Sequence, residues 1–171
     1  AVGLLILVAA FGVSPTSPGG KAGYLAVRAP GLTWLTHVAA RRSDRMLRAV
    51  LRTLLHRPDA VTGELLAQVK AVLDRPGAGA AWASFQHDEV RWRGPRAYFV
   101  DELASLGCPV VLLAGEHDGL VSPADVRAAA DRIPGSRYRQ LPDAGHWLPR
   151  DAPGPVVAEL TDLLDRTRYR R

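Results

Sequence analysis

The stretch that decides the fold is VVLLAGEHDGLVSP, residues 110–123. Its first five residues are all apolar, which is typical of a strand that a parallel sheet buries on both faces. Gly115 ends this run, and Glu116, His117 and Asp118 follow at once. Because ligands of parallel α/β sheets bind beyond the carboxyl ends of the strands, this tip is a candidate functional site.

Strand and helix patterns alternate around this stretch. The sequence predicts strands over 2–8, 109–114 and 136–141, and helices over 98–107, 122–135 and 154–166. Ser122 is the expected N-cap of the second helix, with Pro123 at its first position. The tail 166–171 is expected to fray. This order predicts the α/β class, with a partial parallel sheet of about three strands and flanking helices.

The region between the first two strands is predicted to be helical. Within 31–93, helical spacing indicates segments over 37–57, 57–77 and 78–89, after a Pro- and Gly-rich loop over 12–20. A basic stripe on the first segment could bind anions, but a solvated helix face explains it better. The tryptophans here, Trp34, Trp82 and Trp92, could line a substrate pocket, although helix packing is the preferred interpretation.

Composition narrows the classes of partner. Hydrophobic residues make up 47% of the 171 residues, so a packed core can form. The net charge of +5 comes almost entirely from Arg, without the interleaved aromatics of a stacking platform, so we expect no nucleic-acid partner.

The apolar residues 1–13 are too short for a membrane helix and lack a basic leader, so we expect no membrane association. One cysteine, Cys108, permits neither a disulfide framework nor a cysteine zinc site, and we expect a cytoplasmic protein.

The residues that could carry chemistry are Asp118 and His146, each directly after a predicted strand. If the two strands are neighbours, the carboxylate can fix the tautomer of the imidazole and stabilise its charged form. Asp118 could instead cap a local turn, and His146 could be a loop residue without chemistry. A metal site built from these two residues with Glu116 and His117 is the weakest alternative, because adjacent side chains diverge.

Two stretches resemble the α/β-hydrolase fold family. CPVVLLAGEHDGLVSP (108–123) is similar to the strand and turn that carry the catalytic acid, and RYRQLPDAGHWLPRDAP (137–153) is similar to the last strand and the histidine loop. The resemblance implies that Asp118 is the catalytic acid and His146 the general base. It also implies a core strand and cap entry over 1–14, a helical cap over 15–95, and the C-terminal part of the core over 96–171.

The sequence departs from that family in one respect. No G-x-S-x-G motif occurs, and the nearest stretch, GVSPT (12–16), lacks the closing Gly, so Ser14 is rejected as the nucleophile. We therefore expect the C-terminal part of a cofactor-free hydrolase, with its nucleophile upstream of residue 1 and without a metal. The 171 residues alone are expected to be inactive, and the unpaired edge of the first strand is expected to promote self-association.

Several functions stay open at this point. For the whole enzyme, hydrolysis of carboxylic esters with a small hydrophobic substrate is the preferred hypothesis. An Asp nucleophile would instead indicate an epoxide or haloalkane hydrolase, which uses the same acid and histidine. The alternative outside catalysis is an α/β binding module or a truncated pseudo-enzyme.

Overall fold

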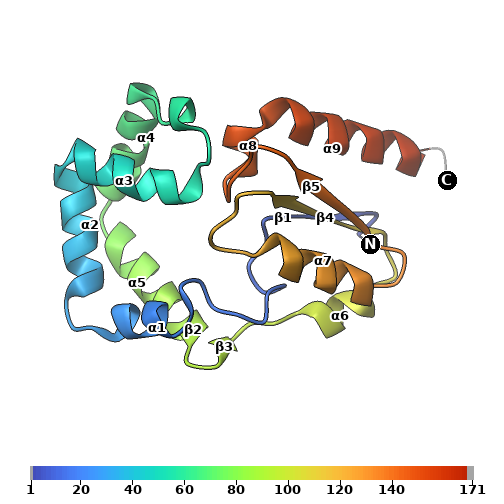
Figure 1. The fold of residues 1–171 in the computed structure, drawn as a ribbon, viewed down its shortest axis with the longest axis horizontal. Helices are drawn as coiled ribbons and strands as arrows, with labels where there is room; N and C mark the ends of the chain where they lie inside the picture. Colours follow the sequence, from blue (N-terminus) through green and yellow to red (C-terminus); the bar gives the residue numbers. More distant parts are fainter. Residues whose placement is uncertain (1, 169–171) are drawn as a thin grey trace.

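A parallel sheet of three strands forms the centre of the α/β part. The computed structural model describes residues 2–168, with side chains described through residue 165. The sheet has the order β1-β4-β5, with β1 over Leu5–Val8, β4 over Val110–Gly115 and β5 over Arg137–Leu141. Both pairings are parallel. The predicted class and the three predicted strands are therefore confirmed, with strand ends shifted by at most three residues (Figure 1).

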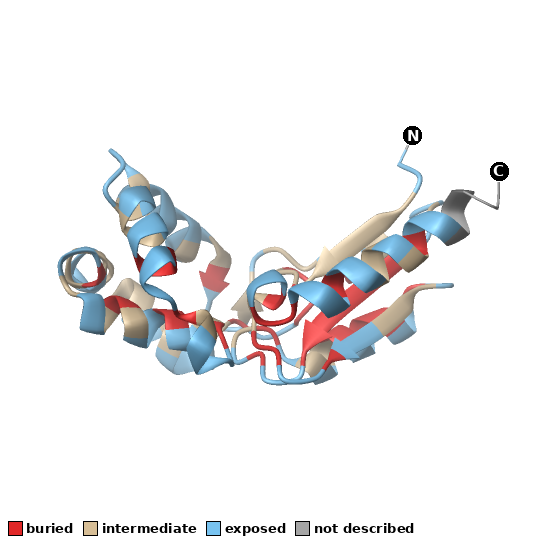
Figure 2. Ribbon diagram, turned by 90° about the horizontal axis from the view of Figure 1, so that it is seen from above, coloured by how far each residue is buried: buried red, intermediate tan, exposed pale blue. Residues whose placement is uncertain are grey.

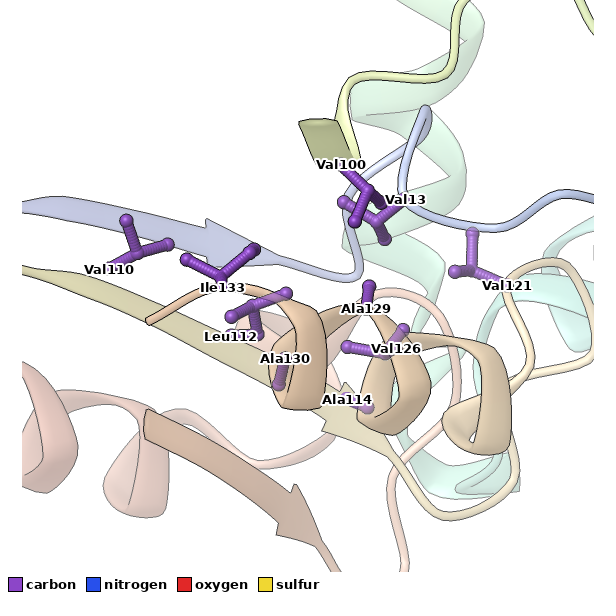
Figure 3. Packing of buried hydrophobic residues seen from close by; sticks show 10 residues of the cluster. All are labelled: Val13, Val100, Val110, Leu112, Ala114, Val121, Val126, Ala129, Ala130 and Ile133. Atoms are coloured by element: carbon purple, nitrogen blue, oxygen red, sulfur yellow. The ribbon is translucent and has the colours of Figure 1, made fainter. Parts of the chain in front are cut away.

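The middle strand, β4, is buried along its whole length. Its side chains alternate between two cores, as the period of a strand requires. Leu112 packs on one face against α7 (Pro123–Arg132), in the cluster shown in Figure 3. Leu113 packs on the other face against α9 (Pro153–Arg168). Figure 2 shows the buried residues gathered where the sheet meets these helices.

The first strand, β1, is less buried than its apolar sequence indicates. All four of its residues are only partly buried, although they pack alternately against the cores on both faces of the sheet. Its sole strand partner among residues 2–168 is β4, which leaves the other edge unpaired. Self-association through this edge stays a prediction.

A group of helices lies beside the sheet (Figure 1), and the buried apolar residues between positions 40 and 66 of this group form a core of their own. Its members are α1 (Gly20–Arg28), α2 (Leu32–Arg42), α3 (Asp44–Leu54), the 3-10 turn η1 (Pro58–Ala60), α4 (Gly63–Leu73) and α5 (Ala78–Glu89). The division at 14/15 and 95/96 stays a prediction, although this separate core is what a helical cap over 15–95 requires.

Two features of the helical group differ from the prediction. The segment expected over 37–57 is broken at Ser43, whose backbone is extended and whose Oγ accepts a hydrogen bond from the Met46 amide at 3.3 Å. Ser43 therefore ends α2 and caps α3. Helix α1 begins inside the predicted loop, because the left-handed backbone of Gly19 (φ 71°) turns the Pro-Gly-Gly segment directly into a helix.

The remaining elements are short. A hairpin of β2 (Val90–Arg91) and β3 (Gly94–Pro95) leads back from the helical group, followed by α6 (Val100–Ala104) and, after β5, by α8 (Leu148–Asp151).

The predicted helix ends are only partly right. Pro123 stands at the start of α7 as expected, but Ser122 makes no side-chain cap, so that detail was wrong. Helix α9 continues to Arg168, three residues into the tail expected to fray, and 169–171 lie outside the described residues. Within the described part of the chain, no helix combines the length and apolar character needed to cross a bilayer.

Candidate active site

The loops after β4 and β5 meet at one edge of the sheet. Gly115 is paired with Leu141 at the ends of the two parallel strands. The ladder then continues into the loops, where the Glu116 amide donates to the Leu141 carbonyl at 3.0 Å and the His117 amide donates to the Ala144 carbonyl at 2.9 Å. These backbone hydrogen bonds hold the two loops side by side. They therefore bring the side chains of one loop close to those of the other.

Asp118 and His146 are in hydrogen-bond contact. Asp118 Oδ2 lies 3.0 Å from His146 Nδ1, which is the contact expected from the sequence. The other carboxylate oxygen, Oδ1, accepts from the amides of Leu120 at 2.8 Å and Val121 at 2.9 Å. Asp118 therefore both caps a local turn and orients His146, so the two interpretations of this residue describe one arrangement.

The burial of the pair is unequal. The Asp118 side chain is 1% exposed, whereas that of His146 is 29% exposed. Two amides hold the buried carboxylate in one orientation, and its hydrogen bond to Nδ1 directs Nε2 of the imidazole away from it. His146 Nε2 has no hydrogen-bond partner among the described residues. The side chain lines a cavity of about 430 Å³ with Val8, Ala9, Leu54, Trp147 and Pro149.

A carboxylate that the sequence analysis did not single out anchors the histidine loop. Asp151, in α8, is 1% exposed. Its Oδ2 accepts from the amides of Gly145 at 2.7 Å and His56 at 2.8 Å, and its Oδ1 accepts from the Arg57 amide at 3.1 Å. It thus joins the residue before His146 to the segment between α3 and η1. In the sequence, an acidic residue in a loop gives no signal of this role.

Gly115 makes the contact between the two loops possible. A Cβ on this residue would lie 2.1 Å from the Gly145 carbonyl oxygen and 2.5 Å from that of Ala144, which are backbone atoms. These distances are far shorter than a real contact, so a side chain here must push the histidine loop away from β4.

Gly115→Ala is therefore expected to lower the free energy of unfolding by about 1–3 kcal/mol, as overpacking does. Gly119→Ala, four residues later, is the matched control, because its Cβ would meet nothing within 4 Å. That variant is expected to stay within about 0.5 kcal/mol of the parent. Denaturant unfolding of the three proteins provides the measurement, and equal stability of the two variants would contradict the close approach.

Ser14 lies in a different hydrogen-bond network. It is 4% exposed, and its Oγ donates to Asp125 Oδ2 at 2.6 Å, at the first turn of α7. Thr16 Oγ1 contacts the same carboxylate oxygen at 3.2 Å. Among the described residues no hydrogen bond joins Ser14 to His146, which agrees with its rejection as a nucleophile.

The metal site considered at the tip of β4 is not assembled. Asp118 turns inward to His146, whereas His117 lies outside and stacks on His56 with ring centroids 3.7 Å apart. Glu116 Oε2 is 3.9 Å from His117 Nε2. The four residues therefore do not share one site, because Asp118 pairs with His146 whereas Glu116 and His117 stay together outside.

The helical group encloses a larger cavity of about 720 Å³. Most of its lining comes from α2, α3, α4 and α5, and Leu120 and Trp147 from the two site loops also line it. Trp82 contributes one wall and is 56% exposed, and Trp34 is 67% exposed. The preference for helix packing was therefore wrong for these two tryptophans, while Trp92 packs edge-on against Tyr24.

Comparison with known proteins assigns the family. The model of the alpha/beta hydrolase fold matches residues 37–153, which is more than half of the chain. The chain therefore belongs to the alpha/beta hydrolase fold family, as the two motifs implied. The search of curated proteins gave no match.

Solved structures show the same fold. A thermophilic esterase from Thermogutta terrifontis is 24% identical, with a TM-score of 0.64 over 96% of this chain and 56% of its own. An alpha/beta hydrolase fold protein from Burkholderia ambifaria is 23% identical, with a TM-score of 0.71 over 95% of this chain and 57% of its own. An enol-lactonase from Burkholderia xenovorans LB400 is 20% identical, with a TM-score of 0.67 over 96% of this chain and 56% of its own. The chain thus spans little more than half the length of these structures, and identities this low show the fold alone.

Proposed function

We propose that this chain supplies the catalytic acid and the general base of a cofactor-free hydrolase of carboxylic esters. The observation that carries the proposal is the contact of 3.0 Å between Asp118 Oδ2 and His146 Nδ1, which leaves His146 Nε2 without a protein partner beside a cavity. This is the arrangement by which an imidazole takes a proton from a nucleophile and later returns it to the leaving group.

Each residue has a defined task in this reaction. His146 Nε2 accepts the proton of the attacking hydroxyl, and the imidazolium that forms then protonates the leaving alcohol. Asp118 stays ionised, keeps the Nδ1–H tautomer and stabilises the imidazolium. The nucleophile and the oxyanion donors come from a segment outside these 171 residues, because the sequence holds no G-x-S-x-G motif.

The substrate class is proposed from the helical group. Its cavity of about 720 Å³ is lined mainly by apolar side chains and reaches Trp147, the neighbour of His146. A small hydrophobic acyl or alkyl group is the ligand that such a lining favours. The similar structures include an esterase, an enol-lactonase and a meta-cleavage product hydrolase, so ester hydrolysis is among the reactions that proteins of this fold perform.

Covalent labelling tests where the nucleophile lies. An alkyl fluorophosphonate should leave the 171-residue chain unmodified, because Ser14 is buried and bound to Asp125. The protein extended by its upstream coding sequence should be modified once, at a serine before residue 1. Peptide mass spectrometry gives the position, and His146→Ala should slow the labelling strongly because the serine loses its base.

Two results would contradict the proposal. A label on Ser14 would place the nucleophile inside the chain. An extended protein that resists the fluorophosphonate but is alkylated on an upstream Asp by an epoxide or a haloalkane would replace ester hydrolysis with that alternative reaction.

A further inference from the structure

Three potential metal ligands that are distant in sequence converge beside the candidate active site. His56 follows α3, His117 follows β4, and Asp143 follows β5. One ligand atom from each lies within 4.8 Å of the others, and all three residues are exposed. None of them takes part in the Asp118–His146 contact, so this cluster is separate from the proposed catalytic machinery.

The backbone of the cluster is held in place. The His56 amide donates to buried Asp151 Oδ2 at 2.8 Å, and the His117 amide donates to the Ala144 carbonyl at 2.9 Å. Asp143 adopts a left-handed backbone with φ of 52°, in the turn just before Ala144. The imidazoles of His56 and His117 are stacked, with an interplanar angle of 15°. The three side chains are thus presented by fixed segments and meet without any rearrangement of the chain.

We propose that His56, His117 and Asp143 bind a divalent transition-metal ion of the Zn²⁺ class. Imidazole nitrogens and a carboxylate oxygen are the donor types that Zn²⁺ takes in proteins, and three protein ligands leave a position for water. The Oε2 atom of Glu116, 3.9 Å from His117 Nε2, adds a second carboxylate next to the cluster. The resulting negative charge favours a cation at this point of the surface.

Metal binding needs only a small adjustment of exposed side chains. Bond lengths of about 2.0–2.2 Å place the ligand atoms of a tetrahedral site about 3.4 Å apart. The atoms must therefore approach from a spread of at most 4.8 Å, and one ring must rotate out of the parallel stack. Such rotations of exposed side chains occur readily. The bound ion would join the segment between α3 and η1, through His56, to both loops of the candidate active site.

Titration of the tag-free 171-residue chain with ZnCl₂, in competition with a chromophoric chelator, tests the site. We expect one Zn²⁺ per chain, and an increase in melting temperature at saturation, because the ion binds the folded chain. His117→Ala and His56→Ala should each weaken binding about 10-fold or more, since loss of a direct ligand costs at least as much as loss of an outer partner. Asp143→Asn should also weaken it, because the amide is a poorer ligand.

His87→Ala is the matched control, because His87 is also exposed and has an acidic neighbour, Asp88, with Nδ1 to Oδ1 at 3.7 Å. This variant should bind Zn²⁺ as the parent does. Far-UV circular dichroism verifies that each variant is folded, and no variant removes a buried side chain. Absence of binding to the parent, or equal affinities for folded His117→Ala, Asp143→Asn and His87→Ala, would overturn the proposal.

Discussion

Asp151→Ala is expected to lower the free energy of unfolding by about 3–5 kcal/mol, because three hydrogen bonds to one charged group are lost together. The carboxylate accepts three amide hydrogen bonds, from His56, Arg57 and Gly145. Hydrogen bonds to a charged group contribute about 1.5–3 kcal/mol each, and their loss leaves the buried Gly145 N–H without an acceptor. The same change removes the link between the histidine loop and the segment between α3 and η1, so the position of His146 should become less fixed as well.

Denaturant unfolding measures this effect, with two further variants for comparison. Asp151→Asn keeps the size of the side chain but directs an amide N–H₂ at amide donors, so it should recover only part of the lost stability. Asp131→Ala is the matched control, because this carboxylate is 70% exposed and faces only Arg127, at 3.7 Å. It should change stability by less than about 0.5 kcal/mol. If the free energy of unfolding of Asp151→Ala were within about 1 kcal/mol of that of the parent, the three hydrogen bonds would not stabilise the histidine loop as proposed.

The sheet could be predicted because its signal is local. The apolar run 110–114 is long enough to identify a strand, and β4 is indeed buried throughout. The position of Asp118 after β4 and of His146 after β5 then followed from the parallel arrangement, since both loops must emerge at the same edge. The contact at 3.0 Å is the consequence of that topology.

The helical group shows where local patterns are insufficient. Leu47 and Leu51, four residues apart in the segment predicted over 37–57, are both buried, as one apolar face of a helix requires. The break at Ser43 and the start of α1 after Gly19 depend on single backbone conformations, which periodicity does not report. Trp82 lines a cavity that only the tertiary arrangement defines, and Trp34 is exposed without lining it.

The contacts that tie the site together could not be predicted for a related reason. Asp151 acts on amides nearly a hundred positions earlier in the chain, and His56 meets His117 and Asp143 only after three separate segments have packed. No spacing motif connects these residues. Gly115 could be predicted in part. The sequence places it at the end of the strand, but it does not show how closely the Gly145 carbonyl approaches it.

The proposed cooperation between Asp118 and His146 implies the largest kinetic effect in this protein. Removal of His146 takes away the proposed general base, and the loss of a triad histidine lowers turnover by at least about 10⁴-fold. Asp118→Asn should lower it substantially while retaining the fold, because the amide keeps the size of the side chain but not the charge that stabilises the imidazolium. His87→Ala, on the exposed surface, should leave turnover unchanged.

The most direct measurement is steady-state hydrolysis of a chromogenic short-chain ester by the protein that carries its upstream coding sequence, compared with its His146→Ala variant. We expect saturable turnover that falls by at least about 10⁴-fold in the variant, with KM little changed and the fold intact. The 171 residues alone should show no saturable turnover. Turnover by a folded His146→Ala protein within about tenfold of the parent would contradict the assignment of His146 as the general base.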